Sequence, residues 1–313
     1  MAVECGLRVS QRFLPPQVQQ KAPAGYRQAK RALRHEPRVK PITQPEPQAQ
    51  PATVNGKLFA AALKNAAKFT YTQMERAWHS NDLVPSRPVL HSVSVETEPG
   101  TVRLVATDTH RAYIATVECD GGETGQVTLP VETALALAKE LAGQAQITFT
   151  ASEDGLHLPG RSLLARDRHN RHFVNWRKSV PNRDKSTAVT LQVAELLQGV
   201  NLVNIIAKDD NGRVRFEVGA EDLTLRAESD GWSKEQGWST SGGAAASYAV
   251  PMLSAEGEHT SVHLSASYVK QFLQTLGKRS QVTAYLQPEG TEIPVALFTA
   301  PGVEYVVMPM GAK

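Results

Sequence analysis

"QVTLPVETALALAKELAGQAQITF" (residues 126–149) decides the fold, because the chain carries a second copy of its pattern, "SVHLSASYVKQFLQTLGKRSQVTA" (residues 261–284). Sliding the sequence along itself by 135 residues aligns the two stretches without a gap. Five residues of the first stretch then fall on identical residues of the second: Val127, Leu129, Leu141, Gln146 and Thr148. An internal repeat of this length indicates two domains that share one fold.

Both copies predict the same order of elements. A run in which apolar and polar residues alternate indicates a strand. Apolar residues three and four positions apart then indicate a helix, and a second strand follows. The helical positions are Ala134, Leu137, Ala138 and Leu141 in the first copy, and Val269, Phe272, Leu273 and Leu276 in the second. The same offset brings the helical stretch 57–69 close to the helical stretch 192–206. Each copy therefore contains two helices.

Short alternating runs lie between these helices, for example "HSVSVETE", "RAYIATVE", "RVRFEVG" and "EYVVMPM". Turn residues separate them, and we read residues 98–100 and 209–212 as hairpin turns. Such runs predict antiparallel meanders, which need helices on one face to cover them. We expect an α+β fold with two tandem domains, 53–182 and 185–313, each with two helices packed on an antiparallel sheet.

Composition places the chain in an ordinary globular class. About 41% of its 313 residues are apolar, which suffices for two cores. No apolar run approaches the length of a membrane span, and no signal-peptide pattern opens the chain, so we expect a cytoplasmic protein. Cys5 and Cys119 lie far apart and outside any CxxC pattern, which indicates neither a disulfide framework nor a zinc site.

The first 52 residues differ from the rest. They hold nine basic and three acidic residues and are rich in proline and glutamine, whereas the remaining chain is mildly acidic. No apolar period is sustained there, so the composition predicts a disordered tail. It is either a solubilising tail, or a start assigned too early, or an electrostatic tether for nucleic acid.

Catalytic and metal-binding patterns are weak. Asp108 and His110 in "ATDTHRAY" could begin a hydrolytic relay, but no nucleophile elbow such as GxSxG accompanies them. His157, His169 and His172 lie among arginines, which repel a metal ion. Asp209 and Asn211 begin like a calcium loop, yet Ala220 stands where the closing glutamate is expected. We therefore expect no enzyme, no cofactor and no metal site.

Four segments resemble a known family in order and spacing: "LHSVSVETEPGTVRLVATDTHRAY" (90–113), "FVNWRKSVP" (173–181), "ASYVKQFLQTL" (266–276) and "YVVMPM" (305–310). They are similar to the second and third domains of the bacterial sliding clamp, the beta subunit of DNA polymerase III. The resemblance covers nearly all of residues 53–313 and leaves out the first 52. We expect no counterpart of the family's first domain, because the tail is too short and too polar.

The resemblance implies a ring of six domains whose helices line a hole for duplex DNA, with weak contacts to phosphates and none to bases. Lysines and arginines on or near the helices would supply the attraction, although each could equally be a solvated surface residue. These DNA-facing candidates are Lys64, Lys68, Arg87, Lys139, Lys270, Lys278 and Arg279. Val131 and Glu132 stand where the family often carries basic residues.

The resemblance also accounts for the apolar C-terminal run. In the family this strand forms one wall of an apolar cleft that takes up short motifs from polymerases, the clamp loader and repair proteins, and methionines suit varied peptides. Carried over, the cleft comprises Leu90, Thr107, Thr109, His110, Arg111, Ala112, Val174, Lys178, Ser179, Pro294, Val306, Val307, Met308, Pro309 and Met310. For Val307 we favour a place in the core.

Four of these positions depart from the family. Thr109 replaces a usual glycine, Ala112 a larger aliphatic residue, Val174 a proline and Ser179 a valine. These changes predict an altered cleft wall and leave the identity of the partner polymerase open.

The expected function is a sliding-clamp-like processivity factor that contacts duplex DNA and tethers polymerase and clamp-loader motifs. A ring of six domains needs three copies of a two-domain chain. We therefore expect a homo-oligomer, with a trimer as the favoured state. The alternative is a monomeric regulator that keeps the cleft but forms no ring.

Overall fold

The computed structural model describes residues 50–76, 83–165, 173–229, 232–233, 237–238, 243–287, 291 and 295–311. The chain divides into two compact units, residues 1–48 and 49–313, and everything below concerns the second. Most of the predicted tail lies outside the described residues. Its last residue, Ala52, is buried and opens the first strand, so the ordered fold begins slightly earlier than predicted.

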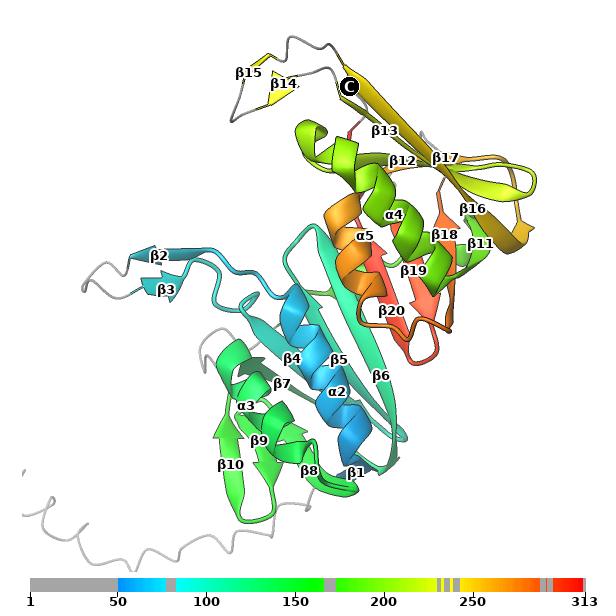
Figure 1. Ribbon diagram of the computed structural model, residues 1–313. Coiled ribbons are helices and arrows are strands. Elements are labelled where there is room, and N and C mark those ends of the chain that lie inside the picture. The colour runs from blue at the N-terminus through cyan, green and yellow to red at the C-terminus, as the bar shows by residue number, and fades with distance from the viewer. Residues whose placement is uncertain are drawn as a thin grey trace, which may run out of the picture. The chain divides into compact units, whose positions relative to one another are not determined.

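Sixteen strands form one continuous sheet built from two repeats with the same strand order (Figure 1). In the first repeat the order is β10 (Arg161–Leu164), β9 (Gly155–Leu158), β8 (Gln146–Ser152), β1 (Ala52–Asn55), β6 (Arg111–Gly121), β5 (Thr101–Thr107), β4 (Ser92–Glu98) and β7 (Gly125–Pro130). In the second it is β20 (Val303–Val307), β19 (Ala296–Ala300), β18 (Gln281–Leu286), β11 (Thr187–Gln192), β16 (Ala244–Glu256), β13 (Asp222–Ser229), β12 (Arg213–Val218) and β17 (Ser261–Ser265).

Two short hairpins stand apart from this sheet. One pairs β2 (Met74–Arg76) with β3 (Leu83–Pro85), and the other pairs β14 (Trp232–Ser233) with β15 (Gly237–Trp238). All strand pairings of the described residues are antiparallel, as the alternating runs predict.

Each repeat places two helices on one face of its sheet (Figure 1). These are α2 (Gly56–Ala66) and α3 (Val131–Leu141) in the first repeat, and α4 (Val193–Ala207) and α5 (Ala266–Leu273) in the second. Their buried stripes, such as Phe59 and Leu63 of α2, cover the sheet because a half-buried sheet must be covered. The predicted α+β class with paired helices is confirmed.

The two repeats also share an equivalent side-chain hydrogen bond. Thr53 of β1 and Thr148 of β8 share a hydroxyl contact of 3.0 Å, and Thr190 of β11 and Thr283 of β18 share the same contact at 3.0 Å. Gly199 allows α4 to approach its sheet, because a Cβ there would lie 2.6 Å from the Tyr248 ring.

One predicted turn is confirmed and the other is wrong. Residues 98–100 join β4 to β5, with Gly100 at φ 79°. Residues 209–212 join helix α4 to strand β12 instead of joining two strands. Asn211 adopts the left-handed conformation, and the Gly212 amide donates to the Ala207 carbonyl, which closes the helix.

The two repeats meet where β20 pairs with β6. Val306 lies opposite Ala112 and Tyr305 opposite Tyr113. The chain's last strand therefore joins the sheets of both repeats. Among the described residues no helix is long and apolar enough to span a membrane.

Candidate partner-binding junction and DNA-facing helices

The turn between β5 and β6 is held by its own side chains. Asp108 Oδ1 accepts from the amides of His110 and Arg111, at 3.0 and 3.1 Å. Thr107 Oγ1 donates to the Arg111 carbonyl and accepts from the Thr109 amide. Thr109 has a φ of 82°, in the left-handed region. These contacts hold Thr109 in a conformation that a β-branched residue rarely adopts.

Arg111 links this turn to the second repeat. Its Nε donates to Asp108 Oδ2 at 2.8 Å, and a terminal nitrogen donates to Gln271 Oε1 of α5 at 2.7 Å. The guanidinium lies 5.2 Å from the Phe69 ring and 4.1 Å from the Tyr268 ring. With its side chain 9% exposed, Arg111 contributes to the junction between repeats. Asp108 serves this structure, so nothing in its contacts favours the hydrolytic relay.

Stacked aromatic rings fill the junction on the helix side of the sheet. Phe69 stacks on Tyr113 at 4.7 Å between centroids, Phe272 stacks on Tyr305 at 4.6 Å, and Phe69 and Tyr305 lie 5.4 Å apart. Burial raises the pKa of Tyr113 to about 12, opposed by hydrogen bonds with Thr275 and Asn65. Burial also raises the pKa of Tyr305. Burial therefore favours the neutral hydroxyl at both positions.

A second apolar cluster lies on the other face of the sheet. Ala112 and Ile114 belong to it, whereas the alternating Tyr113 and Ala115 belong to the main core, as strand geometry requires. The cluster comprises Val105, Ala112, Ile114, Phe173, Trp176, Val295, Leu297 and Val306. Phe173 and Trp176, from the segment that connects the repeats, thus cover the sheet where β6 and β20 meet.

The structure divides the predicted cleft residues by exposure. Buried are Leu90, Thr107, Ala112, Val306 and Val307; partly buried are Arg111, Pro309 and Met310; exposed are Thr109, His110, Val174, Lys178, Ser179 and Met308. Pro294 lies outside the described residues. Val307 belongs to the main core, as favoured from the sequence.

Backbone pairing brings part of this set together. Val306 lies opposite Ala112, Val307 lies opposite Arg111, and the Met308 amide donates to the His110 carbonyl at 2.8 Å. Met308 is 44% exposed and Val174 is 42% exposed. Exposed apolar side chains thus flank the second cluster, although the cleft itself stays a prediction.

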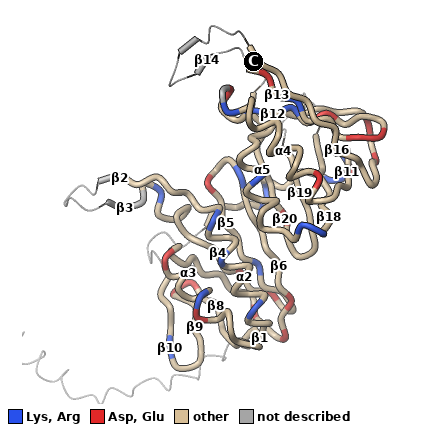
Figure 2. The backbone as a smooth tube through the Cα atoms, viewed as in Figure 1, with Lys and Arg blue, Asp and Glu red and all other residues tan. Residues whose placement is uncertain are grey.

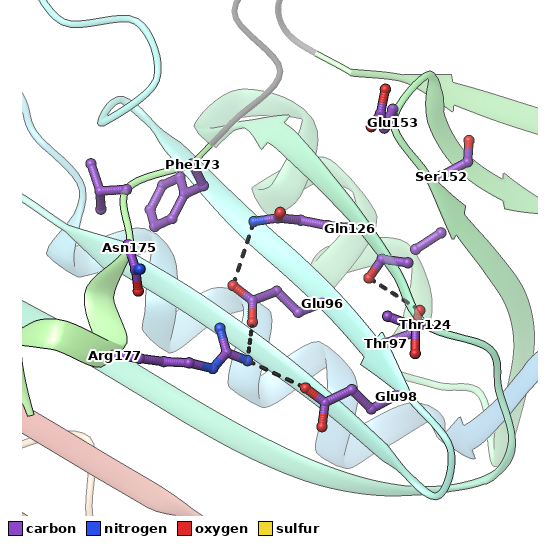
Figure 3. Close-up of a pocket in the computed structure, with 13 residues that line it drawn as sticks. Glu96, Thr97, Glu98, Thr124, Gln126, Ser152, Glu153, Phe173, Asn175 and Arg177 are labelled. Carbon is purple, nitrogen blue, oxygen red and sulfur yellow. Dashed lines mark hydrogen bonds and ion pairs between the residues drawn. The ribbon is translucent and has the colours of Figure 1, made fainter.

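A neighbouring pocket of about 720 Å³ was not singled out by the sequence patterns (Figure 3). Glu96 lies in it, on strand β4, although strand alternation alone does not mark it as buried. The Glu96 carboxylate accepts from Trp176 Nε1 at 3.0 Å. It also accepts from Arg177 at 2.8 Å, and Arg177 reaches Glu98 as well (Figure 3). The hydrogen bond from Arg103 lowers the pKa of Glu98. These ion pairs fasten the connecting segment to the first repeat.

The predicted DNA-facing residues lie on or near the helices. Lys64 belongs to α2, and Lys68 belongs to the 3₁₀ turn that follows it (Ala67–Phe69). Lys139 belongs to α3 and Lys270 to α5. Figure 2 shows basic residues in blue along these helices. Lys278 and Arg279 follow α5, and Arg87 lies 5.5 Å from the Tyr71 ring. All are exposed except Lys270, which is partly buried. Helix α4 contains neither lysine nor arginine.

The metal-binding alternatives find no support in the described part of the chain, where no three His, Cys, Asp or Glu side chains could hold a metal ion. His157 contacts the hydroxyls of Ser152 and Ser162 through its two ring nitrogens. His169 and His172 lie outside the described residues.

Solved structures of sliding clamps share this fold. The chain is similar to a DNA polymerase III subunit beta from Pseudomonas aeruginosa, bound to griselimycin, with a TM-score of 0.65 and 19% identity over 84% of this chain and 65% of that one. For the beta subunit from Thermotoga maritima the TM-score is 0.66 at 16% identity, and the match covers 88% of this chain and 69% of that one. For the sliding clamp from Bacillus subtilis the TM-score is 0.64 at 16% identity, and the match covers 89% of this chain and 67% of that one.

At these identities the likeness shows the fold, and the chain spans about two thirds of each clamp's length. No protein-family model matches the chain, and no curated protein matches it. Which of the clamps' domains the two repeats correspond to stays a prediction.

Proposed function

We propose that this protein is a sliding-clamp-like processivity factor that contacts duplex DNA through its helix face and tethers replication proteins at the outer surface near Met308. The observation that carries the proposal is the repeat itself: two helix pairs on one side of a continuous sixteen-stranded sheet, with the fold of sliding clamps. DNA contact of this kind needs no base readout, only cations near phosphates.

Charge on the helix face supports the DNA side of the proposal. Helix α2 and the turn after it carry Lys57, Lys64 and Lys68 and no acidic residue. Lys64 and Lys68 are both exposed. Acidic residues on the other helices, such as Glu132 and Glu195, keep the total attraction weak. Weak attraction suits a protein that slides.

The outer surface supports the tethering side. Met308 and Val174 expose apolar surface beside the second cluster, and His110 and Lys178 supply polar atoms at its border. Apolar side chains bordered by polar groups are typical of a surface that takes short peptides. The peptides would come from a DNA polymerase and from a clamp loader, and the chain would act as a homo-oligomer without catalysis of its own.

Charge reversal on α2 tests the DNA contact. Changing Lys64→Glu together with Lys68→Glu should weaken binding to a random-sequence duplex at low salt and flatten its salt dependence, since each lost phosphate contact reduces the slope of log K against log salt by about one. The matched control is Lys178→Glu with Lys185→Glu, which changes the net charge equally away from the helices. Equal losses in both double variants would contradict a helix-face contact.

A further inference from the structure

Gln271 of helix α5 makes hydrogen bonds to two parts of the first repeat at once. Its Nε2 donates to the Lys68 carbonyl at 3.0 Å, and its Oε1 accepts from a terminal nitrogen of Arg111 at 2.7 Å. Lys68 lies in the turn after α2, on the surface proposed to contact DNA, and Arg111 opens strand β6. One side chain of the second repeat therefore ties the DNA-facing turn to the β5–β6 turn (residues 108–110).

Only one orientation of the Gln271 amide satisfies both partners. The Lys68 carbonyl can only accept and the Arg111 guanidinium can only donate, so the NH₂ group must face the first and the oxygen the second. The Arg111 side chain is 9% exposed, and a buried charged group that loses a hydrogen-bond partner is costly. Gln271 therefore helps to fix the position of Arg111.

The contacts of Arg111 continue as far as Met308. Its Nε donates to Asp108 Oδ2 at 2.8 Å, and Asp108 Oδ1 accepts from the His110 amide at 3.0 Å. The His110 carbonyl in turn accepts from the Met308 amide at 2.8 Å. An unbroken series of hydrogen-bonded groups thus runs from the DNA-facing turn to the exposed methionine of the proposed partner surface.

Thr109 makes this series sensitive to small changes. Its φ of 82° is unfavourable for a β-branched residue, so the turn keeps this conformation only while neighbouring contacts hold it. The Asp108 carboxylate supplies such contacts, and Arg111 fixes that carboxylate. A strained turn of this kind can exist in a held and a relaxed arrangement, and the relaxed one deprives the Met308 amide of its acceptor.

We propose that Gln271 couples the two surfaces: duplex DNA at Lys68 favours the held arrangement of the β5–β6 turn and thereby fixes Met308 for its partner. A ligand shifts such an equilibrium only if it binds one arrangement better. DNA meets this condition, because the turn that carries Lys68 is tied to Gln271 in the held arrangement. Coupling is reciprocal, so a partner bound at Met308 strengthens DNA binding equally. The inference rests on the proposed function and deepens it.

Hydrogen exchange at the Met308 amide, measured by NMR without DNA, tests the series of contacts. Gln271→Met removes both hydrogen bonds at similar side-chain volume, and exchange at Met308 should accelerate at least about tenfold. Gln274→Met is the matched control, because Gln274 is exposed and lies three residues further along the chain at the end of α5. It should leave the exchange rate unchanged.

A second substitution separates this role from a general loss of packing. Adding Thr109→Gly to Gln271→Met should restore slow exchange at Met308, because glycine adopts the turn conformation without strain. A packing defect at α5 would persist in the double variant. Unchanged exchange in Gln271→Met, or no recovery on adding Thr109→Gly, would overturn the proposal.

Methyl NMR of the methionines tests the coupling to DNA. A saturating random-sequence duplex should shift the Met308 signal and leave that of Met252, in strand β16, unchanged. Gln271→Glu should abolish the Met308 shift, because a carboxylate still accepts from Arg111 but cannot donate to the Lys68 carbonyl. Gln274→Glu, which adds the same charge to the same end of the helix, should retain it.

Fluorescence anisotropy of the labelled duplex in the same samples separates the possible failures. Duplex binding by the wild type without a Met308 shift, or an equal shift in Gln271→Glu, would overturn the coupling alone. An absence of duplex binding by the wild type would overturn both the proposed DNA contact and its coupling to Met308.

Discussion

Thr109 is a strained residue in an otherwise well-satisfied turn. Its φ of 82° places a β-branched side chain in the left-handed region, where a residue with a Cβ loses roughly 1 to 2 kcal/mol. Hydrogen bonds from backbone amides to the side chains of Asp108 and Thr107 hold the turn nonetheless. The threonine therefore adds strain to a turn whose hydrogen bonds are satisfied.

Replacing this residue should stabilise the protein. Thr109→Gly removes the strain at some cost in chain entropy, and the free energy of unfolding should rise by roughly 1 kcal/mol. Urea denaturation measures the change. Asn211→Gly is the matched control, since Asn211 also has a positive φ, 54°, but asparagine tolerates it and the gain should be only a few tenths of a kcal/mol. A destabilised Thr109→Gly variant would show that the threonine is favourable there.

Tyr113 should make stability depend on alkaline pH. Burial raises its pKa from 10.0 to about 12, so the folded state keeps the proton that the unfolded state loses above pH 10. Its contribution is complete below pH 10 and is lost as pH rises toward 12. The loss is at most about 1.4 kcal/mol per pH unit.

The measurement compares wild type with Tyr113→Phe by urea denaturation at about pH 9 and about pH 11. The wild type should lose roughly 1 kcal/mol more than the variant over this interval. Tyr305 and Tyr268, whose pKa values burial also raises, titrate in both proteins and cancel in the comparison. Identical losses would mean that Tyr113 titrates normally.

At the scale of elements, the C-terminal run contributes both to the core and to the exposed surface, and its uniformly apolar sequence does not show which residue does which. Val306 and Val307 are both buried, in the second cluster and the main core respectively, whereas Met308 leaves the strand and is exposed. Strand β6 pairs with this run, and Phe173 and Trp176 of the connecting segment belong to the same cluster as Val306.

Truncations along this run should separate core from surface. Val307→Ala should lower the free energy of unfolding by roughly 2 kcal/mol, because it opens a cavity in the main core. Met308→Ala should change it by less than about 0.5 kcal/mol, since the side chain is largely exposed. Thermal and chemical denaturation measure both. A large loss for Met308→Ala would place Met308 in the core and remove the main support for a partner surface.

The sequence predicts the elements whose pattern is long or repeated. The β7–α3–β8 and β17–α5–β18 units are confirmed because their apolar positions follow one period each. The turn at residues 209–212 is wrong because Asp, Asn and Gly close helices as readily as they form hairpins. The sequence patterns did not single out strands β1 and β11, which run directly into helices α2 and α4.

The candidate site was predictable in part. Positions 306–308 and 110–112 meet across paired strands, as the resemblance implies. The role of Arg111 in the junction was not predictable, because its partners Gln271 and Tyr268 are some 160 residues away in sequence and meet it only in the folded chain. The burial of Glu96 depends in the same way on Trp176 and Arg177.

At the scale of the whole molecule, one continuous sheet joins both repeats and carries all four described helices on one face. Lys64 and Lys68 belong to α2 and the turn after it, whereas Met308 follows β20 beside the second cluster. The proposed DNA contact and the proposed partner surface therefore use different residues. We propose that the assembled protein surrounds duplex DNA and slides along it.

Retention on DNA with blocked ends tests that claim most directly. A duplex carrying biotin at both ends is mixed with the protein, streptavidin is added either before or after, and the DNA is then washed at high salt, which removes electrostatic contacts. The protein should be retained only when streptavidin is added after it, because a ring threads over free ends and cannot leave blocked ones. Retention that does not depend on the order of addition, or complete loss in both cases, would contradict the claim.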